Sequence, residues 1–231
     1  MGDFSHLILP LSLSALVGYL LGSISFAIIL TKAFIKDDVR NFGSGNAGAT
    51  NVLRAAGRRA SALTFALDFL KCAASVFVGY RIVLWACNTY MLDLSYAWLG
   101  MYAAGILCII GHMYPLYFGF RGGKGVVTAS AMMAMIDWRV FLVCSVVFFG
   151  TFFWKKIVSL SSVSAAVTYP IATLVITFLI DYRLHGYSAG YVITATAVAL
   201  IAGFAVIIKH KENIKRLIKG EEKPISFRKS K

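Results

Sequence analysis

Seven apolar runs separated by polar breaks occupy most of this 231-residue chain, and they restrict what it can fold into. The runs lie at residues 7–31, 60–85, 94–118, 126–136, 140–154, 158–180 and 191–208. A helix needs about 20 residues to cross a bilayer, and all but the fourth and fifth runs approach that length. Those two suit half-spans, a re-entrant hairpin or spans in a locally thinned bilayer.

Since 59% of the residues are hydrophobic and only 14% are charged, a water-soluble core could not bury this sequence. We therefore expect an all-α integral membrane protein with about seven transmembrane helices, some of them short.

Basic residues are concentrated in alternate polar breaks, and they give the chain its formal net charge of +13. The rich breaks lie at 32–59, 121–124 and 155–156 and in the tail from about 209, whereas the others hold isolated arginines at most. Positively charged breaks of membrane proteins face the cytoplasm, so we expect the N-terminus outside and the C-terminus in the cytoplasm. This topology accounts for the basic excess, which gives no reason to expect nucleic acid as a partner.

The chain contains no Pro- or Ser-rich linker, so we expect one polytopic domain over residues 1–231 with a short basic cytoplasmic tail from about 209. The tail sequence KHKENIKRLIK places Ile214, Leu217 and Ile218 at helical spacing, which predicts an amphipathic helix at the cytoplasmic face. An alternative role for its lysines is an anchor on anionic headgroups. The four cysteines form no metal-binding pattern and are interpreted as small buried residues.

The segment GSGNAGATNVLR at 43–54 is the first of four polar clusters, all of which lie on the basic side. Its glycines let backbone amides converge, and Arg54 adds a planar charged group that suits phosphate or carboxylate. The segment matches G-x-G-x-x-G at Gly43, Gly45 and Gly48, but this motif indicates a dinucleotide only within a βαβ unit, which this chain cannot supply. A dinucleotide site is therefore excluded, and the alternatives are an anion-binding loop or a tight interhelical turn.

The second cluster, HMYPLYFGFRGGKG at 112–125, surrounds Lys124 with glycines. It is not a Walker A loop, because Gly125 follows the lysine where that motif has Ser or Thr. The cluster predicts a flexible loop that carries a point positive charge. His112, near the cytoplasmic end of an apolar run, is more typical of a packing or hydrogen-bonding residue than of a base.

Two further clusters follow, and one charged pair lies within an apolar run. In VSLSSVSA at 158–165, the serines could face a site or bond to helix carbonyls. In KHKEN at 209–213, His210 and Asn213 are three residues apart and are expected to share a helix face. Asp68 and Lys71 are also three apart, and we expect a structural ion pair, with support of a pocket as the alternative.

Several catalytic signatures are absent from the sequence. Acyl-CoA-dependent glycerolipid acyltransferases typically carry a histidine followed five residues later by an aspartate, and no histidine of this chain has that partner. There is also no G-x-S-x-G elbow. No carboxylate-rich cluster offers a Mg²⁺ site. We therefore expect no metal and no cofactor, and a chemistry in which Lys, Arg and amide groups meet anionic substrates.

The clusters together resemble the bacterial acyl-phosphate:glycerol-3-phosphate acyltransferases, the PlsY family, over nearly the whole chain. The resemblance rests on GSISFA at 22–27, RNFGSGNAGATNVLR at 40–54, LDFLK at 67–71, GHMYPLYFGFRGGKGV at 111–126, VSLSS at 158–162 and HKENIKRLIKGEE at 210–222. These segments occur in the family's order and on the same side of the membrane. Two departures, Ala47 where the family usually has Pro and Cys72 where it has Gly, affect loop rigidity and helix packing but no charged position.

The resemblance implies transfer of an acyl group from acyl phosphate to the 1-hydroxyl of sn-glycerol 3-phosphate, giving lysophosphatidate and phosphate for phospholipid biosynthesis. It implies a multi-pass protein of the bacterial inner membrane with a cytoplasmic active site, in contact with membrane lipid and supplied by a soluble acyl-phosphate synthase. The residues that it implies as catalytic are Ser44, Arg54, Lys124, His210 and Asn213. The residues that it implies as substrate-binding are Gly43, Gly45, Asn46, Thr50, Asn51, Gly122, Gly123 and Ser159.

Other functions predict features that the sequence does not show clearly. A transporter or channel for a phosphorylated metabolite would place polar residues at mid-bilayer depth and repeat one half of the chain in the other. A membrane scaffold would leave four polar clusters on one face without a role. For the enzyme, the missing carboxylate base leads to the hypothesis that the substrate's own phosphate accepts the hydroxyl proton.

Overall fold

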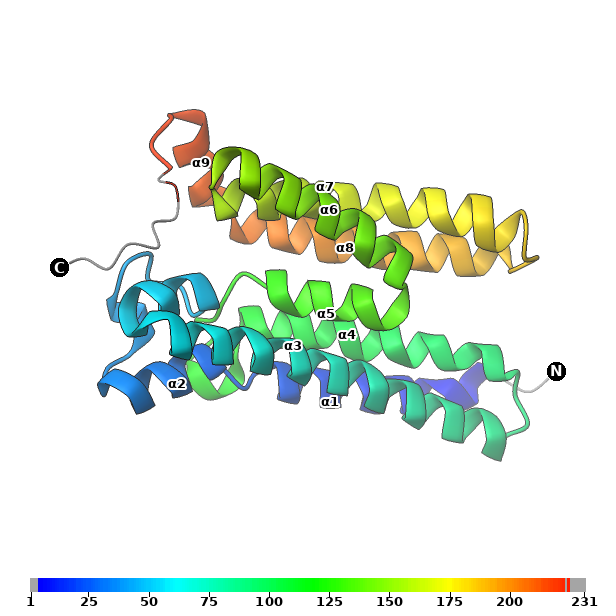
Figure 1. Cartoon of the computed structure of the whole chain (residues 1–231). Helices are drawn as coiled ribbons and strands as arrows, with labels where there is room; N and C mark the ends of the chain where they lie inside the picture. The colour runs from blue at the N-terminus through cyan, green and yellow to red at the C-terminus, as the bar shows by residue number, and fades with distance from the viewer. Residues whose placement is uncertain (1–3, 223, 225–231) are drawn as a thin grey trace. The chain divides into compact units, whose positions relative to one another are not determined.

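The computed structural model describes residues 4–222 and 224, and their regular structure is helical throughout. These residues form two compact units, one up to Ile136 and the other from Asp137 (Figure 1). The helices of the first unit are α1 (Ile8–Gly22), α2 (Phe26–Ile35), α3 (Ala49–Thr89), α4 (Ala97–Met113) and α5 (Val126–Ile136). Those of the second are α6 (Trp138–Lys155), α7 (Val158–Ile176), the π-helix Thr177–Tyr182, α8 (Ala189–Lys209) and α9 (Lys211–Ile218). Short 3-10 turns lie at Phe4–Leu7, Val39–Asn41, Leu94–Tyr96 and Leu116–Phe118. The all-helical prediction is confirmed, whereas a single domain stays a prediction.

Within the described residues, six helical segments are long and apolar enough to cross a membrane. They are Phe4–Ile35, Ala49–Thr89, Leu94–Phe118, Trp138–Lys155, Val158–Tyr182 and Ala189–Lys209. The fourth apolar run forms the 11-residue helix α5, which at about 1.5 Å per residue covers only part of a hydrocarbon core. The fifth run is longer than its apolar residues suggest, because Asp137 caps α6 and begins the helix at Trp138. Among the described residues, length and composition therefore support six full spans, one fewer than the seven apolar runs of the sequence.

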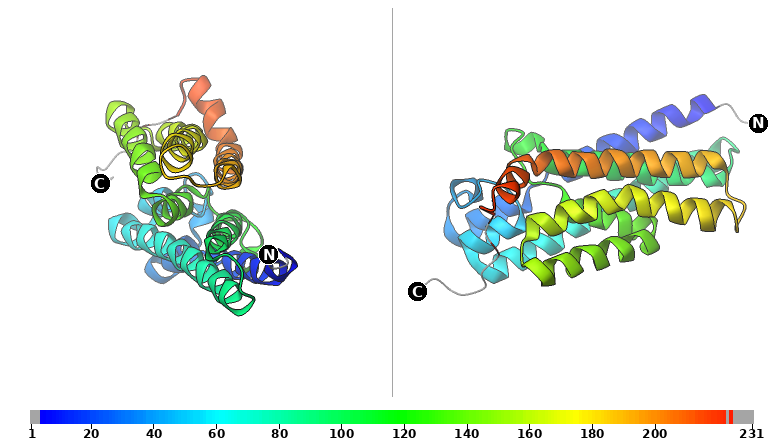
Figure 2. Two further views of the ribbon diagram at one scale, coloured as in Figure 1. Left: turned by 90° about the vertical axis from the view of Figure 1, so that its right-hand side faces the viewer. Right: turned by 90° about the horizontal axis from the view of Figure 1, so that it is seen from above.

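Close packing in the first unit depends on small residues where helices cross. A Cβ on Gly18 of α1 would overlap the backbone of Ala104 of α4, and one on Gly79 of α3 would overlap the backbone of Gly100. Such contacts let helix backbones approach closely where hydrophobic burial alone drives little association. The side-by-side course of α1, α3 and α4 is visible in the views of Figure 2.

Helix α3 is interrupted by Gly57, whose backbone lies at φ +83° and ψ −175°. A φ in this region favours glycine, and the turn separates a short helical arm from the apolar segment that follows. The hydroxyl of Ser61 bonds across the interruption to the Ala49 carbonyl at 2.9 Å. Arg54 therefore lies on the short arm rather than on the membrane-spanning part of α3.

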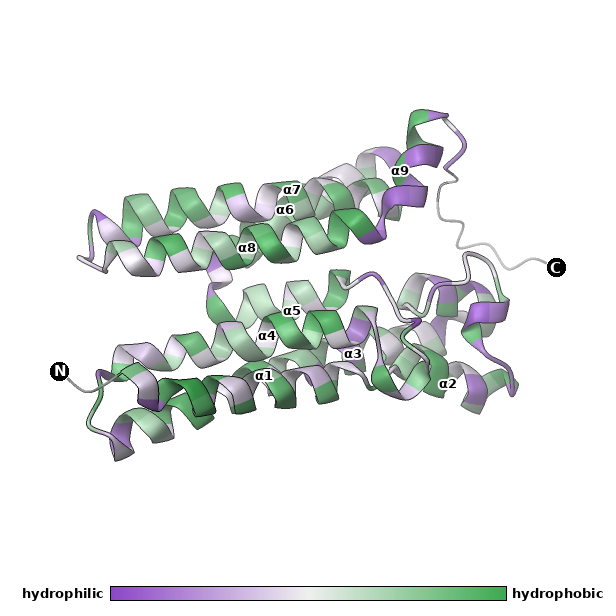
Figure 3. Cartoon of the chain, turned by 180° about the vertical axis from the view of Figure 1, so that it is seen from behind, coloured by the Kyte–Doolittle hydropathy of each residue, from purple (hydrophilic) through white to green (hydrophobic). Residues whose placement is uncertain are grey.

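In the second unit, α7 packs against both α6 and α8, and α9 follows α8 after a break at His210. Hydrophilic residues of this unit gather on α9, and those of the first unit gather at the end that holds α2 (Figure 3). The helical tail is confirmed over Lys211–Ile218. The basic tail beyond Glu222, apart from Pro224, lies outside the described residues. The expected orientation across the membrane stays a prediction.

Candidate functional site

The loop before α3 is held in shape by the side chain of Asn51, which is 2% exposed. Its Nδ2 donates to the carbonyls of Val39 and Phe42, both at 2.9 Å, and its Oδ1 accepts from the Ser44 amide at 3.2 Å. These bonds satisfy loop backbone groups that no helix ladder reaches. Asn51 therefore positions the loop, and the role in substrate binding that the resemblance implies for it stays a prediction.

Two glycines of this loop are required by its geometry. Gly43 and Gly45 lie at φ +51° and +68°, and a Cβ on Gly43 would come within 2.5 Å of Asn51 Oδ1. The same Cβ would lie 3.5 Å from Arg54 Cδ, so the Arg54 side chain runs beside the loop. Ser44 and Arg54 are exposed, and Asn46 and Thr50 are partly buried. The loop thus presents a hydroxyl and a guanidinium to its surroundings, next to the first turn of α3.

Arg40 ties this loop to the one that carries Lys124. Its Nη1 donates to the Phe118 carbonyl at 2.8 Å, and its Nη2 pairs with Asp38 Oδ2 at 2.8 Å. The Asp38 carboxylate also caps the Val39–Asn41 turn by accepting from the Arg40 amide. The side-chain hydrogen bond from Arg40 is the main reason why the pKa of Asp38 lies below its usual value.

The glycines around Lys124 allow the second loop to pack tightly on the end of α4. The Gly123 amide donates to the His112 carbonyl at 3.0 Å, and a Cβ on Gly122 would overlap that same oxygen. A Cβ on Gly123 would overlap His112 Nε2 and lie 2.7 Å from the Ala47 carbonyl oxygen. The two loops therefore meet at Gly123 and Ala47, which places the residue before Lys124 against the loop that carries Ser44.

Beneath this contact lies a buried ionic network. Lys71 Nζ pairs with Asp68 Oδ1 at 2.8 Å, which confirms the expected ion pair. The same nitrogen lies 3.1 Å from His112 Nδ1 and donates to the Ile24 carbonyl at 2.6 Å. His112 is buried and hydrogen-bonded, as its sequence context indicates.

In the second unit, three side chains converge on the carboxylate of Glu222. The Ser159 hydroxyl and Asn213 Nδ2 both donate to Oε1 at 2.6 Å, and Arg216 Nε donates to Oε2 at 2.6 Å. Desolvation raises the pKa of Glu222, but the hydrogen bonds outweigh it and leave the pKa below its usual value. Glu222 is not among the residues that the resemblance implies for the site, although it ends the tail motif that contains Asn213.

The neighbouring serines of α7 behave differently from Ser159. Ser161 and Ser162 donate to the carbonyls four residues earlier, Ile157 and Val158, at 3.0 and 2.8 Å. This is the common use of serines in membrane helices. Of the three, Ser159 is the one that bonds to a side chain of the tail.

His210 lies at the break between α8 and α9, one residue before α9 begins, and is 2% exposed. It therefore does not share a helix face with Asn213 in the way that a continuous helix would allow. Its Nδ1 lies 2.8 Å from the Val206 carbonyl, which can only accept, so Nδ1 carries the proton. In the neutral ring, Nε2 then holds a lone pair.

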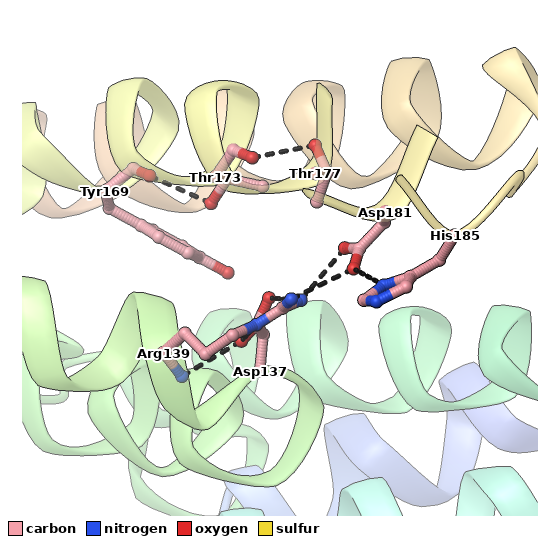
Figure 4. Close-up of polar contacts among 7 residues, drawn as sticks. All are labelled: Asp137, Arg139, Tyr169, Thr173, Thr177, Asp181 and His185. Carbon is pink, nitrogen blue, oxygen red and sulfur yellow. Dashed lines mark hydrogen bonds and ion pairs between the residues drawn. The ribbon is translucent and has the colours of Figure 1, made fainter. Parts of the chain in front are cut away.

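The second unit holds another polar cluster, which the sequence does not predict. Arg139 forms bidentate ion pairs with Asp137, on its own helix end, and with Asp181 of the π-helix, at 2.8 to 3.0 Å (Figure 4). His185 Nδ1 approaches Asp181 Oδ1 at 3.8 Å. Ser159 lies in the first turn of α7 and Asp181 follows the last turn, so this cluster lies at the opposite end of α7 from Ser159. The sequence indicated Arg139 only as an isolated charge, since its partner Asp181 is 42 residues away.

Comparison with known proteins gives one consistent result. Residues 12–220 match the family described as Glycerol-3-phosphate acyltransferase. Proteins of that name from Aquifex aeolicus and Macrococcus caseolyticus are 39% and 34% identical to the chain. The alignment with the first covers 88% of this chain and 93% of the relative, and that with the second covers 96% and 100%. Two crystal structures of the integral membrane glycerol 3-phosphate acyltransferase PlsY are similar to the chain, each with 94% of this chain and 96% of theirs covered. The glycerol 3-phosphate form has a TM-score of 0.71 at 36% identity, and the lysophosphatidic acid form 0.69 at 34%.

Proposed function

The chain belongs to the glycerol-3-phosphate acyltransferase family, and we propose that it transfers an acyl group from acyl phosphate to the 1-hydroxyl of sn-glycerol 3-phosphate. Membership makes it a multi-pass integral membrane acyltransferase. In the proposed reaction, the hydroxyl oxygen bonds to the acyl carbon and the bond from that carbon to the phosphate oxygen breaks. The products are lysophosphatidate and inorganic phosphate.

The observation that best supports this proposal is the contact of the two loops of the first unit at Gly123 and Ala47. It brings the segment that ends in Lys124 beside the segment that carries Ser44, while Arg54 runs along the same loop. We assign Ser44, Asn46, Arg54 and Lys124 to phosphate oxygens and to the acyl carbonyl, with Thr50 beside them. Fixed cations and amide donors can stabilise the charge that develops on these oxygens in the transition state.

The remaining residues of this loop pair act through shape. Asn51, Gly43 and Gly45 set the course of the first loop, and Gly122 and Gly123 let the second pack against it. A loop that is already ordered before substrate arrives holds reacting groups in place without a further loss of entropy. These residues therefore support binding even where they make no direct contact.

We assign Ser159, His210 and Asn213 of the second unit to the glycerol hydroxyls. Glu222 orients Ser159 and Asn213, and the Val206 carbonyl orients the His210 ring. With its proton on Nδ1, neutral His210 can accept a hydrogen bond from a hydroxyl at Nε2. We propose that the leaving phosphate takes the hydroxyl proton, because its oxygens gain negative charge as the bond to carbon breaks. A pH–rate profile that is governed by His210 and abolished in His210→Ala, with binding intact, would contradict this step.

The charge distribution supports a site on the cytoplasmic side of a bacterial inner membrane, supplied with acyl phosphate by a soluble synthase. Thiol labelling tests this orientation, because the four native cysteines are buried. A cysteine at the exposed position Met91 should react with an impermeant reagent in intact cells, and one at Lys156 only after permeabilisation. The reverse pattern would place the loops on the other side.

The decisive experiment mixes the purified protein in lipid with acyl phosphate and labelled glycerol 3-phosphate and measures labelled lysophosphatidate. Acyl-CoA serves as the comparison donor in a parallel reaction. We expect product from acyl phosphate and little from acyl-CoA. No product from acyl phosphate, or a clear preference for acyl-CoA, would overturn the assignment of the donor.

A further inference from the structure

The buried ammonium of Lys71 makes two hydrogen-bond contacts and one ion pair. An ammonium group carries three hydrogens and accepts none. Its three near neighbours are the Ile24 carbonyl at 2.6 Å, Asp68 Oδ1 at 2.8 Å and His112 Nδ1 at 3.1 Å. Lys71 therefore donates to the Ile24 carbonyl and to the histidine ring, and its charge is balanced by Asp68.

This arrangement fixes the proton on the His112 ring. Because Nδ1 accepts from Lys71, it carries no hydrogen of its own, and the neutral ring holds its proton on Nε2. His112 Nδ1 lies farther from Asp68 Oδ1, at 3.6 Å, so the Lys71 ammonium at 3.1 Å is the nearer of its two charged neighbours. The network of α3 thus sets both the orientation of the ring and its tautomer.

The opposite edge of the ring contacts the point where the loop that carries Ser44 meets the loop that carries Lys124. A Cβ on Gly123 would overlap His112 Nε2 and would lie 2.9 Å from Cε1, so the loop backbone rests directly on this edge. The Ala47 carbonyl of the other loop lies at the same point, 2.7 Å from that Cβ position. The His112 carbonyl also accepts from the Gly123 amide at 3.0 Å.

We propose that His112 is a positioning residue of the transferase: Lys71 and Asp68 hold its ring as the neutral Nε2–H tautomer, and the ring sets the spacing of the two loops that carry Ser44 and Lys124. This inference rests on the proposed function, since the groups that it positions are those assigned to the substrate phosphate and the acyl carbonyl. His112 itself touches neither substrate in this scheme. The plain alternative is that the network only stabilises the packing of α3 against α4.

Two substitutions separate these roles, because each retains a polar group at the position of only one of the two ring nitrogens. The amide of His112→Asn reaches about as far as Nδ1, so it can still accept from Lys71 but leaves the loops unsupported. The amide of His112→Gln reaches about as far as Nε2, so it can support the loops but removes the acceptor from the buried ammonium. A buried donor that loses its partner destabilises the fold.

We expect His112→Asn to lower kcat/KM for glycerol 3-phosphate about tenfold or more, mainly through KM, with a melting temperature close to that of the wild type. We expect His112→Gln to lower the melting temperature clearly and to retain more of kcat/KM than His112→Asn. His185→Asn, at an exposed histidine outside this network, serves as the control and should change neither quantity. If His112→Asn keeps wild-type kinetics, or if activity falls only in proportion to stability in both variants, the positioning role is wrong.

A spectroscopic measurement tests the same idea without turnover. In protein labelled with ¹⁵N-histidine, the signal that is missing from His112→Gln should report a neutral ring protonated at Nε2. Lys71→Met should shift that signal, because Nδ1 loses its donor. An imidazolium or an Nδ1–H ring would overturn the inference. If the wild type forms no lysophosphatidate from either donor, the proposed function fails. The spectrum still tests the state of the His112 ring in that case, and calorimetric titration of His112→Asn with glycerol 3-phosphate still tests its effect on binding.

Discussion

Asn213 Nδ2 donates to Glu222 Oε1 at 2.6 Å, which joins α9 to the segment that follows it. The same oxygen accepts from Ser159 at the start of α7, so one carboxylate connects two residues that are 54 positions apart. Charge-assisted hydrogen bonds of this kind are short and strong, and here they fix the side-chain rotamers of both donors. Glu222 is therefore the residue on which the geometry of Ser159 and Asn213 depends.

Glu222→Gln should lower turnover about tenfold or more, because the amide cannot accept from all three donors and leaves Arg216 without its charge partner. Glu221→Gln is the matched control, since Glu221 is exposed and no role is assigned to it. Initial rates at saturating acyl phosphate provide the measurement. Equal rates in both variants would remove Glu222 from the site.

The same variant has a predictable dependence on pH. The folded pKa of Glu222 lies below the unfolded value of about 4.3, so the carboxylate stabilises the folded protein above that pH. This stabilisation is lost as the pH falls through the folded pKa. The melting temperature of the wild type should therefore exceed that of Glu222→Gln by a constant amount above about pH 5, and the difference should shrink below about pH 4. A difference that widens toward acid pH would contradict the assigned shift.

Arg54→Ala and Lys124→Ala should each reduce turnover about tenfold or more, because each removes a cation assigned to phosphate or to the acyl carbonyl. Arg59→Ala and Arg121→Ala are controls, since both residues are exposed and neither is assigned to the substrates. The readout is lysophosphatidate formed per minute by equal amounts of folded protein. Wild-type rates in Arg54→Ala or Lys124→Ala would exclude that residue from catalysis.

Asn51→Ala should disorder the first loop, since the carbonyls of Val39 and Phe42 and the Ser44 amide lose their partner. Each unpaired group costs about 1–3 kcal/mol where it stays buried, so the loop should open toward water instead. We expect faster proteolysis between residues 40 and 48, together with a loss of activity. Asn88→Ala, which removes a bond to the Leu84 carbonyl on an exposed face, should leave both unchanged. Normal activity with an unchanged cleavage pattern would show that the loop holds its shape by other means.

Arg139→Met should lower stability without changing the chemistry. It leaves Asp137 and Asp181 without their shared counter-charge, and because the Arg139 side chain is partly exposed, the loss of stability should be smaller than the roughly 3–5 kcal/mol of a fully buried pair. Because the cluster lies at the other end of α7 from Ser159, the rate per folded molecule should stay near that of the wild type. Thermal unfolding and active-site-normalised rates measure the two effects. Arg183→Met, at an exposed arginine of the same end, is the control, and an equal loss of stability there would refute the role of the ion pairs.

Local patterns in the sequence predicted local structure well. Apolar run length predicted the helices, and the three-residue spacing of Asp68 and Lys71 predicted their ion pair, because neighbours on one helix face meet wherever the helix packs. Composition alone also marked the loops that carry Ser44 and Lys124. The site roles of these residues stay predictions.

Features that depend on distant parts of the chain could not be predicted in this way. The partner of Arg139 is 42 residues away, and that of Ser159 is 63 residues away, so no spacing rule connects them. His112 was recognised as a hydrogen-bonding residue, but its contact with Lys71 depends on how α4 packs against α3. The interruption of α3 at Gly57 was missed, because one glycine in a helical pattern is usually tolerated.

The position of Glu222 after the last helix has a consequence for biosynthesis. All six candidate membrane segments precede it in the chain, so they are synthesised before this carboxylate. Until then, Ser159 and Asn213 have no common acceptor. A chain shortened to residue 221 would thus keep all six candidate membrane segments and lose the one carboxylate that Ser159 and Asn213 share.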